Sequence, residues 1–316
     1  VYYTKLFGIN IFKDKSVRIY GDKIPETLLK KNKFWYKKNN NQLVMSSFHI
    51  NSNSFESYIY EILLHKPKYI HSRSSTIFTL ARLINENKKK FRFKLKYIFV
   101  DGEYLTKGQR KIIEDVFECR IINIYGHTEG ALIGHPCKHS NNLHFMPQNG
   151  ILELLDKDNK ILKKKGMKGK IVATGFNNYV FPLLRYYTGD IGIRSNNYCK
   201  CKRNYPLISE VEGREQDYIV DAKQNKIPLA PAIFNYNDMD WIGVEEFKVL
   251  QNTPGKITIN IQKKNEFSRN YLINKIYKKM NSIFGNQILV NVSIVKKIKK
   301  SNIGKHRYLE QKLKLN

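Results

Sequence analysis

Apolar residues recur at two different spacings along the first 126 residues. Three segments carry them every three or four positions, the spacing of a helix with one buried face: 55–64, 75–90 and 106–118. Three shorter apolar runs have the length of buried strands: 69–71, 95–102 and 120–125. Helices and strands alternate, and this order predicts an α/β fold in which helices cover a mostly parallel sheet that binds ligands at the carboxyl ends of its strands.

The pattern changes twice after this region. Residues 150 to about 212 form short β segments separated by turns, which is typical of a β-rich or barrel-like subdomain. The rest of the chain combines strand patterns with one helix pattern, as in a small α+β domain. We therefore predict three parts: an α/β part of a large domain over 1–148, a β-rich subdomain over 149–216 and a small C-terminal domain over 217–316. The first residues, from Val1, read as the middle of a folded region, so we expect sequence upstream.

The net charge of +29 suggests a nucleic-acid partner, but the composition argues against a specific one. Lysines outnumber arginines by 44 to 12 and are interleaved with asparagine, whereas arginine is the residue favoured for base and phosphate contacts. A basic nucleic-acid binder remains a rival class, recognisable by an affinity that falls steeply with salt. No apolar run reaches the roughly 18 residues of a membrane span, and no signal peptide is apparent, so we predict a soluble, cytoplasmic protein.

The stretch "YGHTEG", residues 125–130, follows directly on a predicted strand. Its residue types suit a nucleotide: Tyr125 can stack on a base, Gly126 allows close approach of the backbone, and Thr128 can bond a phosphate. The carboxylate of Glu129 is a ligand type that Mg²⁺ prefers. The alternative is structural, namely a strand that ends in a glycine turn with Thr128 as the cap of a helix.

Four motifs in order give the chain a likeness to a known family: "YGHTEG" at 125–130, "RYYTGDIG" at 185–192, "VEGREQDYIV" at 211–220 and "KKSNIGKHRYLEQ" at 299–311. The chain resembles the adenylate-forming acyl ligases, most closely the branch of phenylacetate-CoA ligase and the capsular polysaccharide biosynthesis ligases. "VDGEYLT" is loosely similar to the family's Gly-Ala-Glu segment. The likeness covers nearly the whole chain, and it implies that residues 1–148 belong to a nucleotide-binding domain and 217–316 to a lid.

The resemblance implies ATP-dependent, Mg²⁺-dependent activation of a carboxylic acid as acyl-AMP, followed by transfer to a thiol such as coenzyme A or to another acceptor. It assigns cofactor contacts to Gly102, Glu103, Tyr125, Gly126, Thr128, Asp190 and Arg214. It assigns catalysis to Thr128, Glu129 and Lys305, with Mg²⁺ on Glu129, and a hinge to Asp217. Ordinary alternatives exist, because Asp190 lies in turn-forming sequence, Arg214 and Asp217 suit a solvated linker, and Lys305 suits an exposed surface. A degenerate, nonenzymatic scaffold of the same fold is the rival function.

Four cysteines in a cytoplasmic chain indicate metal binding or burial rather than disulfides. A structural zinc site is predicted with four ligands, namely Cys137, His144, Cys199 and Cys201. The related ligases often carry Cys-x-Cys-Gly-Arg where this chain has Cys199 and Cys201, and here Lys202 replaces the glycine. His139 is the competing fourth ligand, and reduced, buried cysteines are the alternative.

Two further side chains have predicted places. We expect Cys119 to pack at a helix end and His127 to line the acyl pocket. The family's glycine-rich loop for the β- and γ-phosphates has no counterpart here, since "HSRSSTIF" lacks glycine, and we expect this chain alone to adenylate poorly. The sequence does not identify the acid, the acceptor or the oligomeric state.

Overall fold

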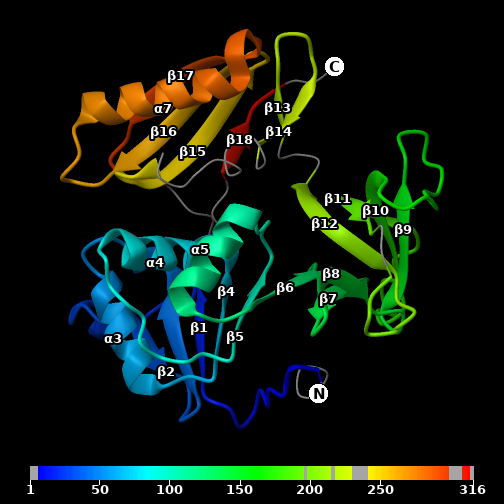
Figure 1. Cartoon of the computed structure of the whole chain (residues 1–316), viewed down its shortest axis with the longest axis horizontal. Coiled ribbons are helices and arrows are strands. Elements are labelled where there is room, and N and C mark those ends of the chain that lie inside the picture. Colours follow the sequence, from blue (N-terminus) through cyan, green and yellow to red (C-terminus); the bar gives the residue numbers. More distant parts are fainter. Residues whose placement is uncertain (1–5, 196–197, 215–217, 230–240, 299–307, 314–316) are drawn as a thin grey trace.

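The computed structural model describes residues 6–195, 198–214, 218–229, 241–298 and 308–313 (Figure 1). Within them, a sheet of twelve strands runs through the first two thirds of the chain, and a sheet of four strands forms most of the C-terminal part. A short hairpin of β13 (Tyr218–Val220) and β14 (Lys226–Pro228) lies between the two sheets in sequence. The α/β fold class predicted from the sequence is confirmed.

The parallel half of the large sheet follows the predicted alternation of strands and helices. Its strands lie in the order β2 (Trp35–Lys37), β3 (Gln42–Ser46), β1 (Ser16–Tyr20), β4 (Tyr69–Arg73), β5 (Tyr97–Asp101) and β6 (Ile121–Gly126). All are parallel except β2, which pairs antiparallel with β3 at the edge. The five parallel strands therefore have their carboxyl ends at the same edge of the sheet, the edge where ligands bind in such folds.

Three helices cover one face of this half: α3 (Phe55–His65), α4 (Ser74–Glu86) and α5 (Lys107–Phe117) (Figure 1). Their apolar side chains join those of the strands in one buried cluster, because alternate strand residues point to the helices. The opposite face is covered by a smaller cluster that includes Leu6, Phe7 and Ile9 from the start of the described chain. A capping box of Thr106 and Gln109 fixes the start of α5.

The antiparallel half continues the same sheet beyond β6. Its strands follow in the order β7 (Ile133–Cys137), β8 (Ser140–Phe145), β12 (Leu207–Arg214), β11 (Tyr186–Arg194), β10 (Lys168–Gly175) and β9 (Gly150–Leu155). The hairpin of β7 and β8 was not identified from the sequence, because its polar and histidine-rich residues lack a clear strand pattern. Gly150 is required where β9 begins, since a Cβ there would lie 2.3 Å from the carbonyl oxygen of Ala131.

The C-terminal sheet has the order β17 (Leu289–Ile294), β16 (Lys256–Lys263), β15 (Val244–Thr253) and β18 (Leu309–Gln311). Helix α7 (Arg269–Phe284) packs on it through buried residues at every fourth position: Leu272, Ile276, Met280 and Phe284. The short β18 was missed by the sequence analysis. Within the described ranges, every helix falls short of the length and apolarity that a bilayer crossing requires.

A set of charged contacts, which we call the clasp, joins the C-terminal domain to α4. The guanidinium of Arg82 donates hydrogen bonds to the backbone carbonyls of Val244 and Glu245, the latter over 2.7 Å, at the start of β15. Glu86, one turn along α4, forms an ion pair with Lys264, whose side chain is only 5% exposed. Arg82 also lies 3.8 Å from Glu86. The clasp therefore places three charged side chains in a largely buried interface, where each depends on its partners.

Replacing Lys264 with Met should weaken the clasp, because Glu86 then loses its closest partner while remaining largely buried. We expect the free energy of unfolding, measured by urea denaturation, to fall by about 1–3 kcal/mol. The matched control is Lys89→Met, which breaks the exposed ion pair with Glu56 and should change stability by less than about 1 kcal/mol. Equal losses in the two variants would contradict a stabilising clasp.

Candidate nucleotide site and metal cluster

The carboxyl end of β6 meets β11 through a hydrogen bond between side chains 65 residues apart. The Tyr125 hydroxyl donates to Oδ2 of Asp190 over 2.6 Å. The ring of Tyr125 packs against Phe145 of β8, with the ring centroids 5.4 Å apart. Two of the residues predicted to contact a nucleotide are therefore direct neighbours, although nothing in their sequence separation indicates it.

A third predicted residue lies beside this pair in the sheet. In the antiparallel ladder of β11 and β12, Asp190 is the register partner of Arg214. The backbone N–H of Asp190 also donates to the hydroxyl of Thr188 over 3.2 Å, and that hydroxyl donates to the carbonyl of Ile171. The backbone at Asp190 is thus fixed by its own strand and by β10, which keeps its carboxylate directed toward Tyr125.

The segment after β6 forms a tight turn rather than the start of a helix. The backbone N–H of Gly130 donates to the carbonyl of His127 over 3.0 Å, and β7 follows. The structural alternative for Thr128, a helix cap, is therefore wrong. Thr128 and Glu129 are both exposed on this turn, as side chains that meet a ligand would be.

His127 pairs with the carboxylate predicted to hold Mg²⁺. Its Nδ1 lies 3.1 Å from Oε2 of Glu129, and its side chain is only 8% exposed. The ring lies between Tyr125 and Tyr186, with centroids 6.3 Å and 6.0 Å away. Its Nε2 is buried and has no hydrogen-bond partner among the described residues. His127 thus combines an aromatic environment with one ring nitrogen that holds Glu129 in place.

The other two residues predicted to contact the nucleotide, Gly102 and Glu103, directly follow β5, the strand that pairs with β6. Asp101 is the register partner of Ile124, so the turn at Gly102 lies next to Tyr125. Glu103 has a structural contact that the sequence did not indicate, since its Oε2 accepts a hydrogen bond from the backbone N–H of Ser75 over 2.8 Å. A carboxylate at the first turn of α4 is favourable for the helix dipole.

Another contact that sequence reasoning missed ties this region to β12. The Tyr104 hydroxyl donates to Oε1 of Glu210 over 2.5 Å. Burial, together with the charge of Glu210, raises the pKa of Tyr104, so the phenol remains a donor. The two residues are 106 positions apart, and no local signal in the sequence points to such a pair. Lys305 and Asp217 lie outside the described residues.

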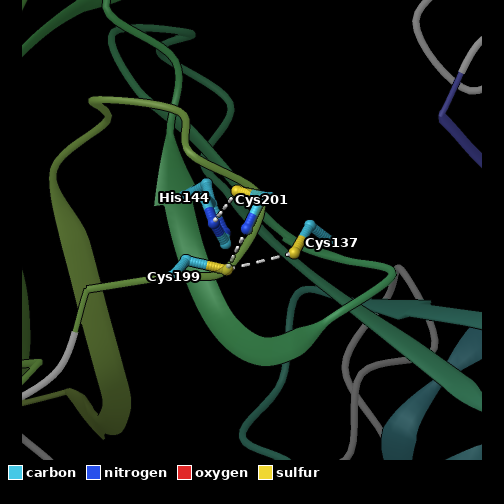
Figure 2. A group of neighbouring side chains, drawn as sticks. All are labelled: Cys137, His144, Cys199 and Cys201. Carbon is cyan, nitrogen blue, oxygen red and sulfur yellow. Dashed lines mark hydrogen bonds between the residues drawn. The ribbon is translucent and has the colours of Figure 1, made fainter.

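The predicted metal ligands form one cluster at the start of the antiparallel half of the sheet (Figure 2). Cys137 ends β7, His144 lies in β8, and Cys199 and Cys201 lie in the segment between β11 and β12. Their ligand atoms all lie within 4.8 Å of one another. His139, the competing ligand, is not in the cluster; its backbone N–H donates to Sγ of Cys137 over 3.3 Å.

The geometry and protonation of the cluster fit zinc. Tetrahedral zinc with Zn–S bonds of about 2.3 Å holds two sulfurs about 3.8 Å apart. Here Sγ of Cys137 and Sγ of Cys199 are 3.4 Å apart, and Sγ of Cys201 is 3.2 Å from Nε2 of His144. Nδ1 of His144 donates to the carbonyl of Asn142 over 3.1 Å, which leaves Nε2 as the lone-pair nitrogen facing the sulfurs.

The pKa values around the cluster distinguish its members. Burial lowers the pKa of His144, so the ring is neutral, as a metal ligand must be. Burial raises the pKa of the Cys199 thiol to about 11. Burial would also raise the pKa of Cys201, but hydrogen bonds, chiefly from the Arg203 backbone, lower it. Cys119, the fourth cysteine, is buried just beyond α5 and has a pKa raised to about 12 by burial.

Comparison with known proteins finds a matching family model and similar individual proteins. The CapK C-terminal domain family matches residues 221–312. Protein CapK of Staphylococcus aureus is 27% identical over 310 residues, which cover 95% of this chain and 65% of that protein. Phenylacetate-coenzyme A ligase of Thermus thermophilus is 27% identical over 137 residues, covering 42% of this chain and 31% of the ligase.

Solved structures of acyl-CoA ligases have the same fold. A 2-hydroxyisobutyryl-CoA ligase crystallised with 2-HIB-AMP superposes with a TM-score of 0.68 and 15% identity, over 96% of this chain and 66% of that one. In sequence the chain is similar to protein CapK and to phenylacetate-coenzyme A ligase, and in fold it is similar to the acyl-CoA ligases. The family resemblance drawn from the four motifs is thereby confirmed.

The anthranilate CoA ligase AuaEII, another adenylate-forming ligase, was crystallised with anthranoyl-AMP and superposes with a TM-score of 0.60 at 14% identity, over 96% of this chain and 59% of that one. The chain spans 65% of the length of protein CapK and 66% of the length of the 2-hydroxyisobutyryl-CoA ligase.

Replacing Tyr125 with Phe removes the hydroxyl and keeps the ring. Because the lost hydrogen bond has a carboxylate acceptor, we expect the free energy of unfolding to fall by about 1–3 kcal/mol in urea denaturation. Tyr179→Phe is the control, since Tyr179 is almost fully exposed, and it should change stability by less than about 0.5 kcal/mol. If the two variants are equally stable, Asp190 does not depend on Tyr125.

Proposed function

We propose that the protein activates a carboxylic acid with ATP, forming an acyl-adenylate and releasing pyrophosphate. The observation that carries this proposal is the hydrogen bond of Tyr125 to Asp190, with Arg214 as the register partner of Asp190. Residues from three distant motifs thereby lie side by side next to the carboxyl end of the parallel strand β6, the edge where nucleotides bind in this class of fold. The adenylates in the structures of the related ligases support the same reaction.

Each residue has a chemical role in the proposed site. The Tyr125 ring stacks on the adenine, and the Asp190 carboxylate accepts hydrogen bonds from the ribose hydroxyls while also accepting one from Tyr125. Arg214 keeps the nucleotide contact that the family resemblance assigns to it, and the Thr128 hydroxyl donates to a phosphate oxygen from the exposed turn. Gly102 and Gly126 let the backbone approach the nucleotide closely.

The reaction itself is an in-line displacement at phosphorus. An oxygen of the substrate carboxylate attacks the α-phosphorus, the bond to the pyrophosphate oxygen breaks, and pyrophosphate leaves with both electrons of that bond. Negative charge builds up on the phosphate oxygens, and the Lys305 ammonium offsets it. Mg²⁺ held by Glu129 would neutralise charge on the leaving phosphates. His127 orients the Glu129 carboxylate for this task through the contact of 3.1 Å.

The second step of the proposal transfers the acyl group from AMP to a thiol, with coenzyme A as the favoured acceptor because relatives of the chain are CoA ligases. A role in cell-surface polysaccharide assembly is suggested by the similarity to protein CapK. Within this proposal, His127 contributes to the acyl pocket beside Tyr186. A cytoplasmic location, where ATP is supplied, and a movement of the C-terminal domain about Asp217 stay predictions.

Nucleotide binding and acid-dependent exchange test the proposed function. We expect AMP to bind the chain in isothermal titration. We expect acid-dependent ATP–pyrophosphate exchange, measured here and below on protein that includes the expected upstream sequence, to identify the substrate among a panel of carboxylic acids. Glu129→Gln should reduce the exchange rate at least about 100-fold, since a neutral amide supplies no charge to Mg²⁺, while AMP affinity changes little. The control is Glu266→Gln, a change at an exposed position of the C-terminal domain.

Wild-type protein that binds no AMP would overturn the proposed function and favour a scaffold. If Glu129→Gln exchanges as fast as the wild type, Glu129 is not the Mg²⁺ ligand. Because AMP binding is measured without Mg²⁺-dependent chemistry, the two outcomes are distinguishable.

We also propose that the Cys₃His cluster holds a structural zinc ion, on the strength of its donor set and of the neutral His144. We expect about one zinc per chain by elemental analysis of protein purified without chelator. Cys201→Ser should lose the metal and lower the melting temperature, because the hairpin of β7 and β8 is then no longer tied to the segment before β12. Cys119→Ala, outside the cluster, should retain the metal. Wild-type protein without zinc would contradict the proposal.

A further inference from the structure

A second polar cluster lies at the same edge of the parallel sheet and is not used by the proposed mechanism. Three side chains converge on the carboxylate of Asp101, the last residue of β5. Tyr20 donates to its Oδ1 over 3.0 Å and Arg73 over 2.9 Å, while Nε2 of His71 lies 2.9 Å from Oδ2. The donors come from the ends of β1 and β4, so three neighbouring strands are joined through one carboxylate.

The electrostatics of this cluster favour a fixed, ionised carboxylate. Burial would raise the pKa of Asp101, whose side chain is 29% exposed, but His71, Arg73 and Tyr20 together lower it. Burial and the nearby Asp101 charge raise the pKa of Tyr20, which therefore remains a donor. The Tyr20 ring is itself held, because the guanidinium groups of Arg73 and Arg18 each lie 4.8 Å from its centroid.

The position of Asp101 connects this cluster to the proposed nucleotide site. The next residue, Gly102, has a φ of +67°, a left-handed conformation that favours glycine. Glu103 then anchors the other side of the turn to the first turn of α4 through Ser75. Asp101 is also the register partner of Ile124, the residue before Tyr125. The turn is therefore held on both sides by carboxylates and lies directly beside the tyrosine that bonds Asp190.

We propose that Asp101 is a positioning residue for the nucleotide: its bonds to Tyr20, His71 and Arg73 fix the Gly102 turn against Tyr125. This inference rests on the proposed function. Its physical basis is that a binding site retains affinity only if the groups around it hold its backbone in place before the ligand arrives. Tyr20, His71 and Arg73 act through Asp101 and are not assigned any contact with the substrate.

The chain offers a matched control at the opposite edge of the same strands. Asp14, two residues before β1, accepts hydrogen bonds from Lys68 and from the Asn10 backbone, each over 2.7 Å. Its pKa is also lowered, with burial opposing the effect of Lys68. Asp14→Asn removes a comparable charge from a comparable ion pair, but at the amino edge, away from the proposed site.

The test compares Asp101→Asn with Asp14→Asn in the whole chain, using AMP as the titrant. We expect the AMP dissociation constant to rise about tenfold in Asp101→Asn, a loss of about 1.4 kcal/mol, and to change less than about twofold in Asp14→Asn. Tyr20→Phe removes one of three donors and should raise it about threefold. In pyrophosphate exchange, the KM for ATP should rise in Asp101→Asn while the KM for the acid does not.

Several results would overturn the inference. One is an equal change in AMP affinity for Asp101→Asn and Asp14→Asn; another is a lower melting temperature for Asp101→Asn with unchanged AMP affinity. If Asp101→Asn does not fold, the variants Tyr20→Phe and Arg73→Lys provide the test. Unchanged AMP affinity in both variants would contradict a positioning role for Asp101. A wild-type chain that binds no AMP removes the proposed function and this inference together, whereas binding that is insensitive to Asp101 removes only the inference.

Discussion

Strand β6 pairs with a parallel neighbour along its first four residues and with an antiparallel neighbour at its last two. Ile121 to Ile124 follow β5, while Tyr125 and Gly126 pair with β7. The change of direction therefore falls at Tyr125, and both halves of the large sheet depend on it. The sheet is continuous through this strand (Figure 1). The carboxyl end of β6 therefore lies beside the part of β11 that carries Asp190, which pairs with Arg214 at the carboxyl end of β12.

The Cys₃His cluster and the proposed nucleotide site share elements of the antiparallel half. His144 on β8 is the register partner of Leu207 on β12, and Arg214 lies seven residues further along the same strand. A tie at the start of β12 therefore limits how far its other end can move relative to β11. The proposed structural metal would therefore contribute to the proposed site without touching a ligand there, by holding the strands that carry Asp190 and Arg214.

The periodicity of the sequence was sufficient to predict α3, α4 and α5, which each present a regular apolar stripe, and β4, β5 and β6, which are short apolar runs. It did not identify β1, β2 and β3, the other strands of this half. It was insufficient for β7 and β8, whose buried positions include His135, Cys137 and His144 in place of an aliphatic run, and for β18, which has three residues and pairs with β15. Family motifs indicated Tyr125, Asp190 and Arg214. Nothing in the sequence indicated the contacts of Glu103 with Ser75 or of Tyr104 with Glu210, because these depend on how separate loops pack.

The clasp between α4 and the C-terminal domain is asymmetric in its chemistry. Arg82 recognises two backbone carbonyls, those of Val244 and Glu245, and not their side chains. Carbonyl acceptors persist through almost any amino-acid replacement, so these two hydrogen bonds do not depend on the side chains at positions 244 and 245. Those side chains have other contacts, because Val244 is buried in the core of the C-terminal domain and the Glu245 carboxylate accepts from Ser52. Arg82 has less freedom, since its planar guanidinium presents its donors in a fixed fork that serves two neighbouring carbonyls. For these two hydrogen bonds, the constraint on side-chain identity therefore falls on Arg82, whereas the ion pair of Glu86 with Lys264 constrains both of its partners.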